Sequence, residues 1–159
     1  MLLRNLGSDH QLQTAWNDLA DGAPTVIGLA SLCGLALAKP LEVCVADQLS
    51  DEAKTILVLA AKRGTIDIRA NRNSFDSADR FLAVCVEYEL DHRFLFLQKD
   101  NPQQTIRFLE GFRELCQHGL VIHHLQKDFS LSSQGFVVAQ TLARSDFESL
   151  IQFAVELEH

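Results

Sequence analysis

The stretch NPQQTIRFLEGFRELCQHGLVIHHLQKDFSLSSQGFVVAQTLA, residues 101–143, changes from helical to strand periodicity and back again. Asn101 and Pro102 suit a helix start, because asparagine caps helix N-termini and proline needs no N–H at the first helical position. Apolar residues at helical spacing follow, at Ile106, Phe108, Leu109, Phe112, Leu115 and Cys116. This pattern predicts a helix over 102–117 that lays one face on a core.

Gly119 comes directly after this helix and is the natural left-handed C-cap. Residues 120–125 are rich in apolar and β-branched residues, which predicts a strand. The stretch therefore predicts the order helix, strand, turn, strand and helix, with the turn at 127–128, the second strand at 129–131 and the last helix capped by Ser132 or Ser133.

Two phrases in this stretch resemble a known fold. Residues 115–121 read LCQHGLV, a helix ending in Gly-Leu-Val, and residues 129–135 read FSLSSQG. Together they resemble the recognition helix, wing and closing helix of winged-helix domains over residues 101–143. The resemblance implies that the 102–117 helix occupies the recognition position and that 120–131 forms the wing. The residues before it look extended, whereas winged-helix domains place two helices there. The whole chain resembles no family.

The bulk properties predict a globular protein of the α+β class. The 159 residues suit one domain, with a helical N-terminal region (1–49), a small antiparallel sheet and a winged-helix-like part within 50–159. Hydrophobic residues make up 47% of the chain and charged residues 22%, and the formal charge is −7. An acidic chain binds phosphate backbones poorly unless it carries a local basic patch. Asp9 and His10 interrupt the first dozen residues, unlike a signal peptide, so we expect a cytoplasmic protein without membrane contact.

The four cysteines are scattered at Cys33, Cys44, Cys85 and Cys116, each in an apolar run. Zinc sites need closely spaced ligands, and no CxxC pair is present. We therefore expect free core thiols in a reducing compartment, with no metal site and no cofactor.

The N-terminal part is predicted to be helical. Residues 9–20 form a first helix with Leu12, Ala15, Trp16 and Leu19 on one side. Residues 25–38 are apolar almost all round, which favours a buried core helix over a DNA-reading helix.

The remaining segments alternate between both types of structure. Ser50 is predicted to cap a helix that ends before Gly64. Residues 77–89 are open between strand, which the alternation favours, and a helix beginning at Asp76. The other predicted elements are strands at 41–45, 65–70, 81–90 and 93–98, and an amphipathic helix at 146–158.

Candidate chemistry is sparse. Glu87, Glu89 and Asp91 could bind a hard cation or do acid–base work, although such a row is more often the solvated face of a strand. His123 and His124 are adjacent in a strand and point to opposite faces, so strand geometry does not let them share a metal.

The predicted 102–117 helix and the wing offer the candidate nucleic-acid contacts. Arginine and glutamine can read guanine and adenine edges in a major groove. Glu110 and Glu114 share the same side of the helix and oppose phosphate approach. The candidate residues are Gln103, Gln104, Arg107, Arg113 and Lys127.

Three functions remain open, in this order. The first is a non-enzymatic protein-interaction or regulatory module on a winged-helix-like scaffold, whose partner is another protein or a second copy in a homodimer. The second is a dimeric, sequence-specific DNA-binding transcriptional regulator in which the last helix forms the dimer interface. The third is an enzyme whose site assembles from scattered residues around His92, Glu87 and Glu89. The first two rest on fold analogy alone.

Overall fold

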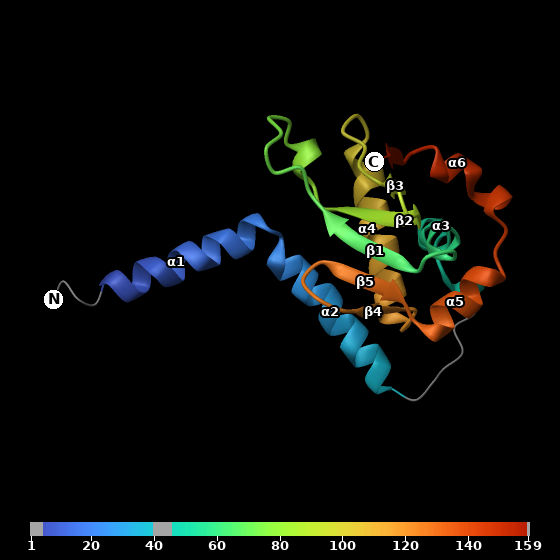
Figure 1. Ribbon diagram of the computed structural model, residues 1–159, viewed down its shortest axis with the longest axis horizontal. Helices are drawn as coiled ribbons and strands as arrows, with labels where there is room; N and C mark the ends of the chain where they lie inside the picture. The colour runs from blue at the N-terminus through green and yellow to red at the C-terminus, as the bar shows by residue number, and fades with distance from the viewer. Residues whose placement is uncertain (1–4, 40–45, 159) are drawn as a thin grey trace.

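A computed structural model describes residues 5–39 and 46–158 and confirms the α+β class. Helices pack around one antiparallel six-stranded sheet with the order β4-β5-β1-β2-β3-β6 (Figure 1). The helices are α1 (Asn5–Ala20), α2 (Ala23–Ala38), α3 (Asp51–Ala60), α4 (Pro102–Gln117), α5 (Ser133–Gln140) and α6 (Glu148–Ile151), with 3-10 turns η2 (Ala46–Gln48), η3 (Ala78–Arg80) and η4 (Arg144–Phe147). The strands are β1 (Thr65–Arg69), β2 (Ala83–Glu89), β3 (His92–Leu95), β4 (Val121–His123), β5 (Asp128–Leu131) and β6 (Val155–Glu158).

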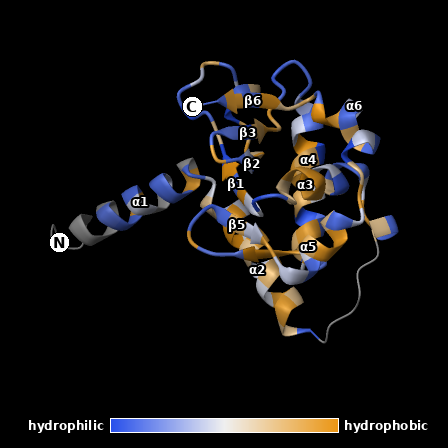
Figure 2. Ribbon diagram, turned by 45° about the vertical axis from the view of Figure 1, so that its right-hand side comes forward, coloured by the Kyte–Doolittle hydropathy of each residue, from blue (hydrophilic) through white to orange (hydrophobic). Residues whose placement is uncertain are grey.

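The core lies between the sheet and the helices α3 and α4, whose apolar faces are turned toward it (Figure 2). Phe96, the residue that follows β3, stacks on Phe108 of α4 with ring centroids 3.9 Å apart. Phe112 meets Phe129 of β5 edge to face at 5.0 Å. Fully buried side chains come from α3, α4 and the strands, among them Ile56, Leu57, Leu59, Ile66, Ile68, Phe94 and Leu115.

The predicted helix ends are confirmed where a capping residue sets them. The Ser50 hydroxyl accepts a hydrogen bond from the Ala53 N–H (3.2 Å), and the Ser132 hydroxyl accepts one from the Gly135 N–H (3.1 Å). Gly119 has φ of 69°, the left-handed conformation expected of a C-cap glycine. Asn101 lies at the N-cap position of α4, but its side chain makes no capping hydrogen bond.

The stretch 101–143 folds in the predicted order of helix, strand, turn, strand and helix. The turn between β4 and β5 is centred earlier than predicted, because Gln126 takes the left-handed conformation with φ of 49°. The Asp128 N–H donates to the Leu125 carbonyl, and the His124 N–H donates to the Asp128 carbonyl, so residue 128 already belongs to the strand.

Two strand predictions are confirmed and the tail prediction is wrong. Strands β1 and β2 lie within the predicted 65–70 and 81–90, and 77–89 holds only the short turn η3 before β2. The predicted helix at 146–158 ends at Ile151, and residues 155–158 form β6 on the open edge of β3. The sequence Val-Glu-Leu-Glu alternates with period two, and this local pattern prevails over the helical spacing of the longer segment. The strand predicted at 41–45 lies outside the described residues.

Helix α2 is not the enclosed core helix that its composition predicts. Val26, Leu29 and Cys33 are buried, on the side that packs against α4 and β4. Ile27 and Leu35, which point away from that side, are exposed, and so is Leu37 near the C-terminal end of the helix. The helix lies at the flank of the body, so only one of its faces has neighbours.

Helices α3 and α4 approach each other closely at Gly111. A Cβ atom added there would lie 2.8 Å from the Ala53 backbone nitrogen. Two polar contacts frame this crossing. The Glu114 carboxylate accepts from the Ser50 N–H at 2.9 Å, and Arg107 Nε lies 3.1 Å from Glu52 Oε1. Glycine is therefore required for the distance between these two helices.

Replacing Gly119 by valine should destabilise the fold by about 1–3 kcal/mol, because a β-branched residue is strained at positive φ. Urea unfolding of Gly119→Val against wild type measures the loss. An unchanged free energy of unfolding would show that the left-handed cap contributes little.

Gly111→Ala should also cost about 1–3 kcal/mol, because its methyl group meets the backbone of α3 and the helices must move apart. Gly34→Ala in α2 is the matched control, since no atom lies within 4 Å of its added Cβ. That change should stabilise the protein by about 0.5–1 kcal/mol through helix propensity. Equal effects in urea unfolding would refute the close-approach argument.

Candidate functional site

The candidate nucleic-acid residues of α4 do not all face solvent. Gln103, Arg107 and Arg113 are exposed, but Gln104 is only 6% exposed, so its place on the open side of the helix was predicted wrongly. Gln104 precedes Phe108 by four residues and shares its buried stripe. Its side-chain nitrogen has no hydrogen-bond partner among the described residues.

The two arginines of α4 are engaged within the protein. Arg107 pairs with Glu52 at 3.1 Å, and the Glu52 side chain is only 10% exposed. Arg113 lies 3.8 Å from Glu110, one turn earlier on the same helix. The neighbouring carboxylates offset part of the positive charge that these arginines would offer a phosphate.

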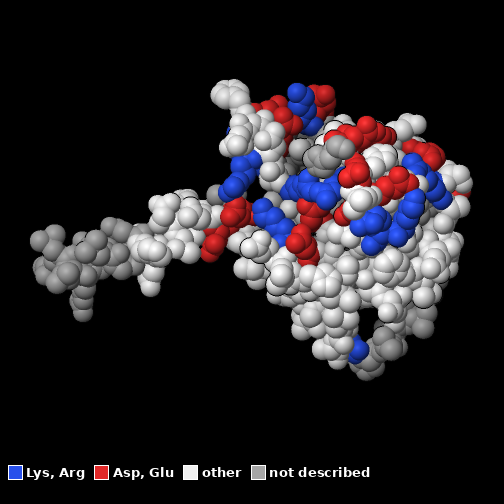
Figure 3. Space-filling view, viewed as in Figure 1, with Lys and Arg blue, Asp and Glu red and all other residues white. Residues whose placement is uncertain are grey.

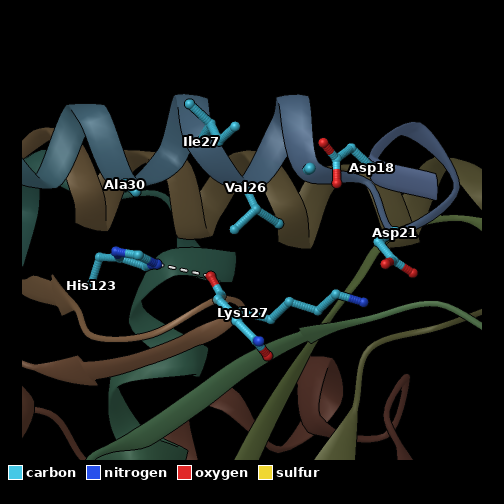
Figure 4. Close-up of a pocket in the computed structure, with 9 residues that line it drawn as sticks. Asp18, Asp21, Val26, Ile27, Ala30, His123 and Lys127 are labelled. Atoms are coloured by element: carbon cyan, nitrogen blue, oxygen red, sulfur yellow. Dashed lines mark hydrogen bonds between the residues drawn. The ribbon is translucent and has the colours of Figure 1, made fainter. Parts of the chain in front are cut away.

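Lys127, the remaining candidate, lies in the β4–β5 hairpin, away from α4, and lines a cleft of about 380 Å³ (Figure 4). The cleft separates this hairpin from the bend between α1 and α2. Asp18 and Asp21 lie at the bend, and Val26, Ile27 and Ala30 of α2 also line the cleft. The Val26 side chain points toward His123 and Lys127 (Figure 4). Its size is at the lower end of small-molecule sites.

The polar groups around this cleft have separate partners. His123 Nε2 is 2.8 Å from the Gln126 carbonyl (Figure 4). Asp21 is paired with Arg72, which lies beyond the cleft. The cleft therefore has the mixed lining of a shallow binding surface, without a nucleophile and base held against each other. Sequence reasoning missed it because its walls are about a hundred residues apart in the chain.

The acidic row Glu87, Glu89 and Asp91 is not gathered into one site. Glu87 contacts Arg63 at 3.0 Å and Arg93 at 3.9 Å. Glu89 accepts a hydrogen bond from Lys62 at 2.5 Å. This contact lowers the pKa of the Glu89 carboxyl and raises the pKa of the Lys62 ammonium. Glu87 and Glu89 are therefore separately paired charges on β2, and Asp91 lies in the turn that follows the strand.

The described cysteines are free thiols inside the fold. Cys33, Cys85 and Cys116 are buried, and Cys44 lies outside the described residues. Burial raises the pKa of the Cys85 thiol to about 12. A hydrogen bond between Cys33 and Cys116 lowers the pKa of the first thiol and raises that of the second. None of these positions resembles an exposed, electropositive site of a nucleophilic thiolate.

The N-terminal arm, which we define as residues 5–38, presents the main exposed apolar surface. Helix α1 projects from the body and α2 continues along its flank (Figure 1). Charged side chains on one face of the molecule gather over the strands, whereas the surface over α2 is nearly free of them (Figure 3). The large exposed apolar side chains of the arm are Leu12, Trp16, Leu19, Ile27, Leu35 and Leu37.

The described part of the chain contains no single helix that is both long and apolar enough to span a membrane. Residues His10–Leu19 and Ala23–Ala38 reach the required length and composition only together, across a bend of 69°.

Comparisons with models of protein families, with curated proteins and with solved structures found no match to this chain.

Proposed function

We propose that the chain is a non-enzymatic protein-interaction or regulatory module on a winged-helix-like scaffold, and that it binds a second copy of itself through the N-terminal arm. The observation that carries the proposal is the uncovered apolar surface of the arm. Trp16 in α1 is 67% exposed and Leu35 in α2 is 63% exposed. Each helix carries further exposed apolar side chains, such as Leu12 in α1 and Ile27 in α2.

Helix α1 needs a partner on energetic grounds. It has 16 residues, and its contacts with the body are mainly with α2. Isolated helices shorter than about 12–15 residues are marginal in water, α1 is only slightly longer, and most helical stability in proteins comes from packing an apolar face. Leu12, Trp16 and Leu19 follow one another at four and three residues and so form one stripe.

A second copy supplies the matching surface. In a two-fold dimer the same patch is used on both subunits, so the α1 stripe of one copy can cover the exposed side of α2 in the other. Covering the six large side chains in both copies would bury on the order of 1,000 Å², near the lower limit for a specific interface. The surface over α2 carries few charges that would have to be desolvated (Figure 3).

The alternative functions have less support. A DNA reader needs cations free to meet phosphates, and Arg107 and Arg113 already have carboxylate partners. An enzyme around His92, Glu87 and Glu89 needs these groups to converge, yet Glu87 is paired with Arg63. We therefore propose that α4, β4 and β5, in a winged-helix-like arrangement, serve as a structural scaffold and not as a DNA-recognition element.

The wild-type protein should be a dimer at micromolar concentration in analytical ultracentrifugation. The double variant Trp16→Glu with Leu35→Glu should be a monomer, because two carboxylates would be buried in an apolar contact. Leu125→Glu is the matched control, since Leu125 is 75% exposed in the hairpin outside the arm. We expect the dimer dissociation constant to rise at least about tenfold in the double variant and to stay unchanged in the control.

A monomeric wild type would overturn the self-association proposal. Flotation of the monomer with phosphatidylcholine vesicles, abolished by the same double substitution, would assign the arm to a lipid surface instead.

A random-sequence duplex should not bind measurably at micromolar protein and physiological salt, because few free cations surround α4. Fluorescence anisotropy tests this expectation. Micromolar binding that weakens steeply with salt and falls on Arg107→Ala would favour the DNA regulator. Selection from a random oligonucleotide pool should accompany the measurement, and enrichment of a defined motif would also overturn the expectation.

A further inference from the structure

One histidine and two glutamates come together on a single face at the β3–β6 edge of the sheet. The strand register pairs His92 with Glu158 and Phe94 with Glu156. Side chains two residues apart in a strand share a face, so both glutamates project beside His92. One possible ligand atom from each residue lies within 4.8 Å of the other two.

The spacing suits ligands of one metal ion. His92 Nε2 is 3.3 Å from Glu156 Oε2. With zinc bonds of about 2.0–2.2 Å, two ligands at a tetrahedral angle lie about 3.4 Å apart. From the sequence we expected no metal site, because the cysteines are widely spaced and the adjacent histidines point to opposite faces. The three ligands proposed now are brought together by the pairing of β3 with β6.

The environment of the His92 nitrogen also favours a bound cation. The His92 side chain is 27% exposed, but its Nε2 atom is shielded from solvent; its one close polar neighbour among the described residues, Glu156 Oε2 at 3.3 Å, does not have hydrogen-bond geometry. A shielded nitrogen without a partner is unfavourable, and a cation bound to its lone pair would satisfy it.

The surroundings orient the imidazole and leave the carboxylates unneutralised. Tyr88 meets the His92 ring edge-on at 5.8 Å, and the Phe94 ring lies 4.8 Å away. The cations that contact Tyr88 are engaged, because Lys62 pairs with Glu89 and Arg144 lies 3.2 Å from Glu148. Glu156 and Glu158 are exposed, so they can adjust to an arriving ion.

We propose that His92, Glu156 and Glu158 form a binding site for a divalent transition-metal cation, with Zn²⁺ as the expected ion. An imidazole nitrogen with two carboxylates suits Zn²⁺, whereas Mg²⁺ and Ca²⁺ prefer an all-oxygen set. Three protein ligands leave one tetrahedral position for water. The ion would link β6 to β3, the strand with which β6 pairs in the sheet.

Isothermal titration of untagged, chelator-treated protein with Zn²⁺ tests the site. We expect one ion per chain with a micromolar dissociation constant, and a rise in melting temperature on binding. Glu158→Gln and His92→Asn should each weaken binding at least about tenfold. Glu110→Gln and His118→Asn are the matched controls, because both residues are exposed on or next to α4, and they should bind as wild type does.

A Co²⁺ titration distinguishes this site from the thiols. The bound ion should lack the intense near-ultraviolet charge-transfer band of sulfur ligation. No saturable binding, a thiolate band at one equivalent, or unchanged affinity in Glu158→Gln would each overturn the proposal. Because Glu158 is exposed, Glu158→Gln should not unfold the protein, and a loss of binding in this variant can be assigned to the lost ligand.

Discussion

The contact between α3 and α4 at Gly111 is the constraint on which the rest of the structure depends. Because Gly111 has no side chain, α4 can approach the α3 backbone at Ala53 closely. The two helices therefore pack as one layer against the sheet. The same crossing draws Arg107 to Glu52 and Glu114 to the Ser50 N–H. Charges that looked available on an isolated helix therefore serve to hold its neighbour. The surface of α4 is defined by this packing as much as by its own sequence.

The parts of the fold that were predictable from sequence are those set by local chemistry. Ser50, Gly119 and Ser132 mark helix ends because each satisfies backbone groups within a few residues. The order of elements over 101–143 follows for the same reason. Helix α2 and the tail could not be read in this way. The composition of α2 shows that it is apolar but not how many neighbours it has, and helical and strand spacing coexist in residues 146–158.

Candidate sites were harder to predict, because they depend on register and on distant contacts. Gln104 could have been placed correctly, since it is four residues before Phe108 on the buried stripe. The pairing of His92 with Glu158 requires knowing that β6 joins β3, and no local pattern indicates this partner. The cleft at Lys127 likewise requires the bend between α1 and α2 to lie beside the hairpin. Sequence periodicity gives the face of a residue, whereas the neighbour across that face comes from topology.

The position of β1 between β5 and β2 has a consequence for biosynthesis. The β2 side of β1 can pair soon after β1 is made, but the other side receives β5 only after residues 128–131 have been added. At about 5–20 residues per second, the unpaired edge persists for several seconds on a translating ribosome. During that time a row of N–H and C=O groups is open to other nascent chains or to chaperones. Codon changes that slow synthesis between β1 and β5 should therefore increase aggregation without altering the finished protein.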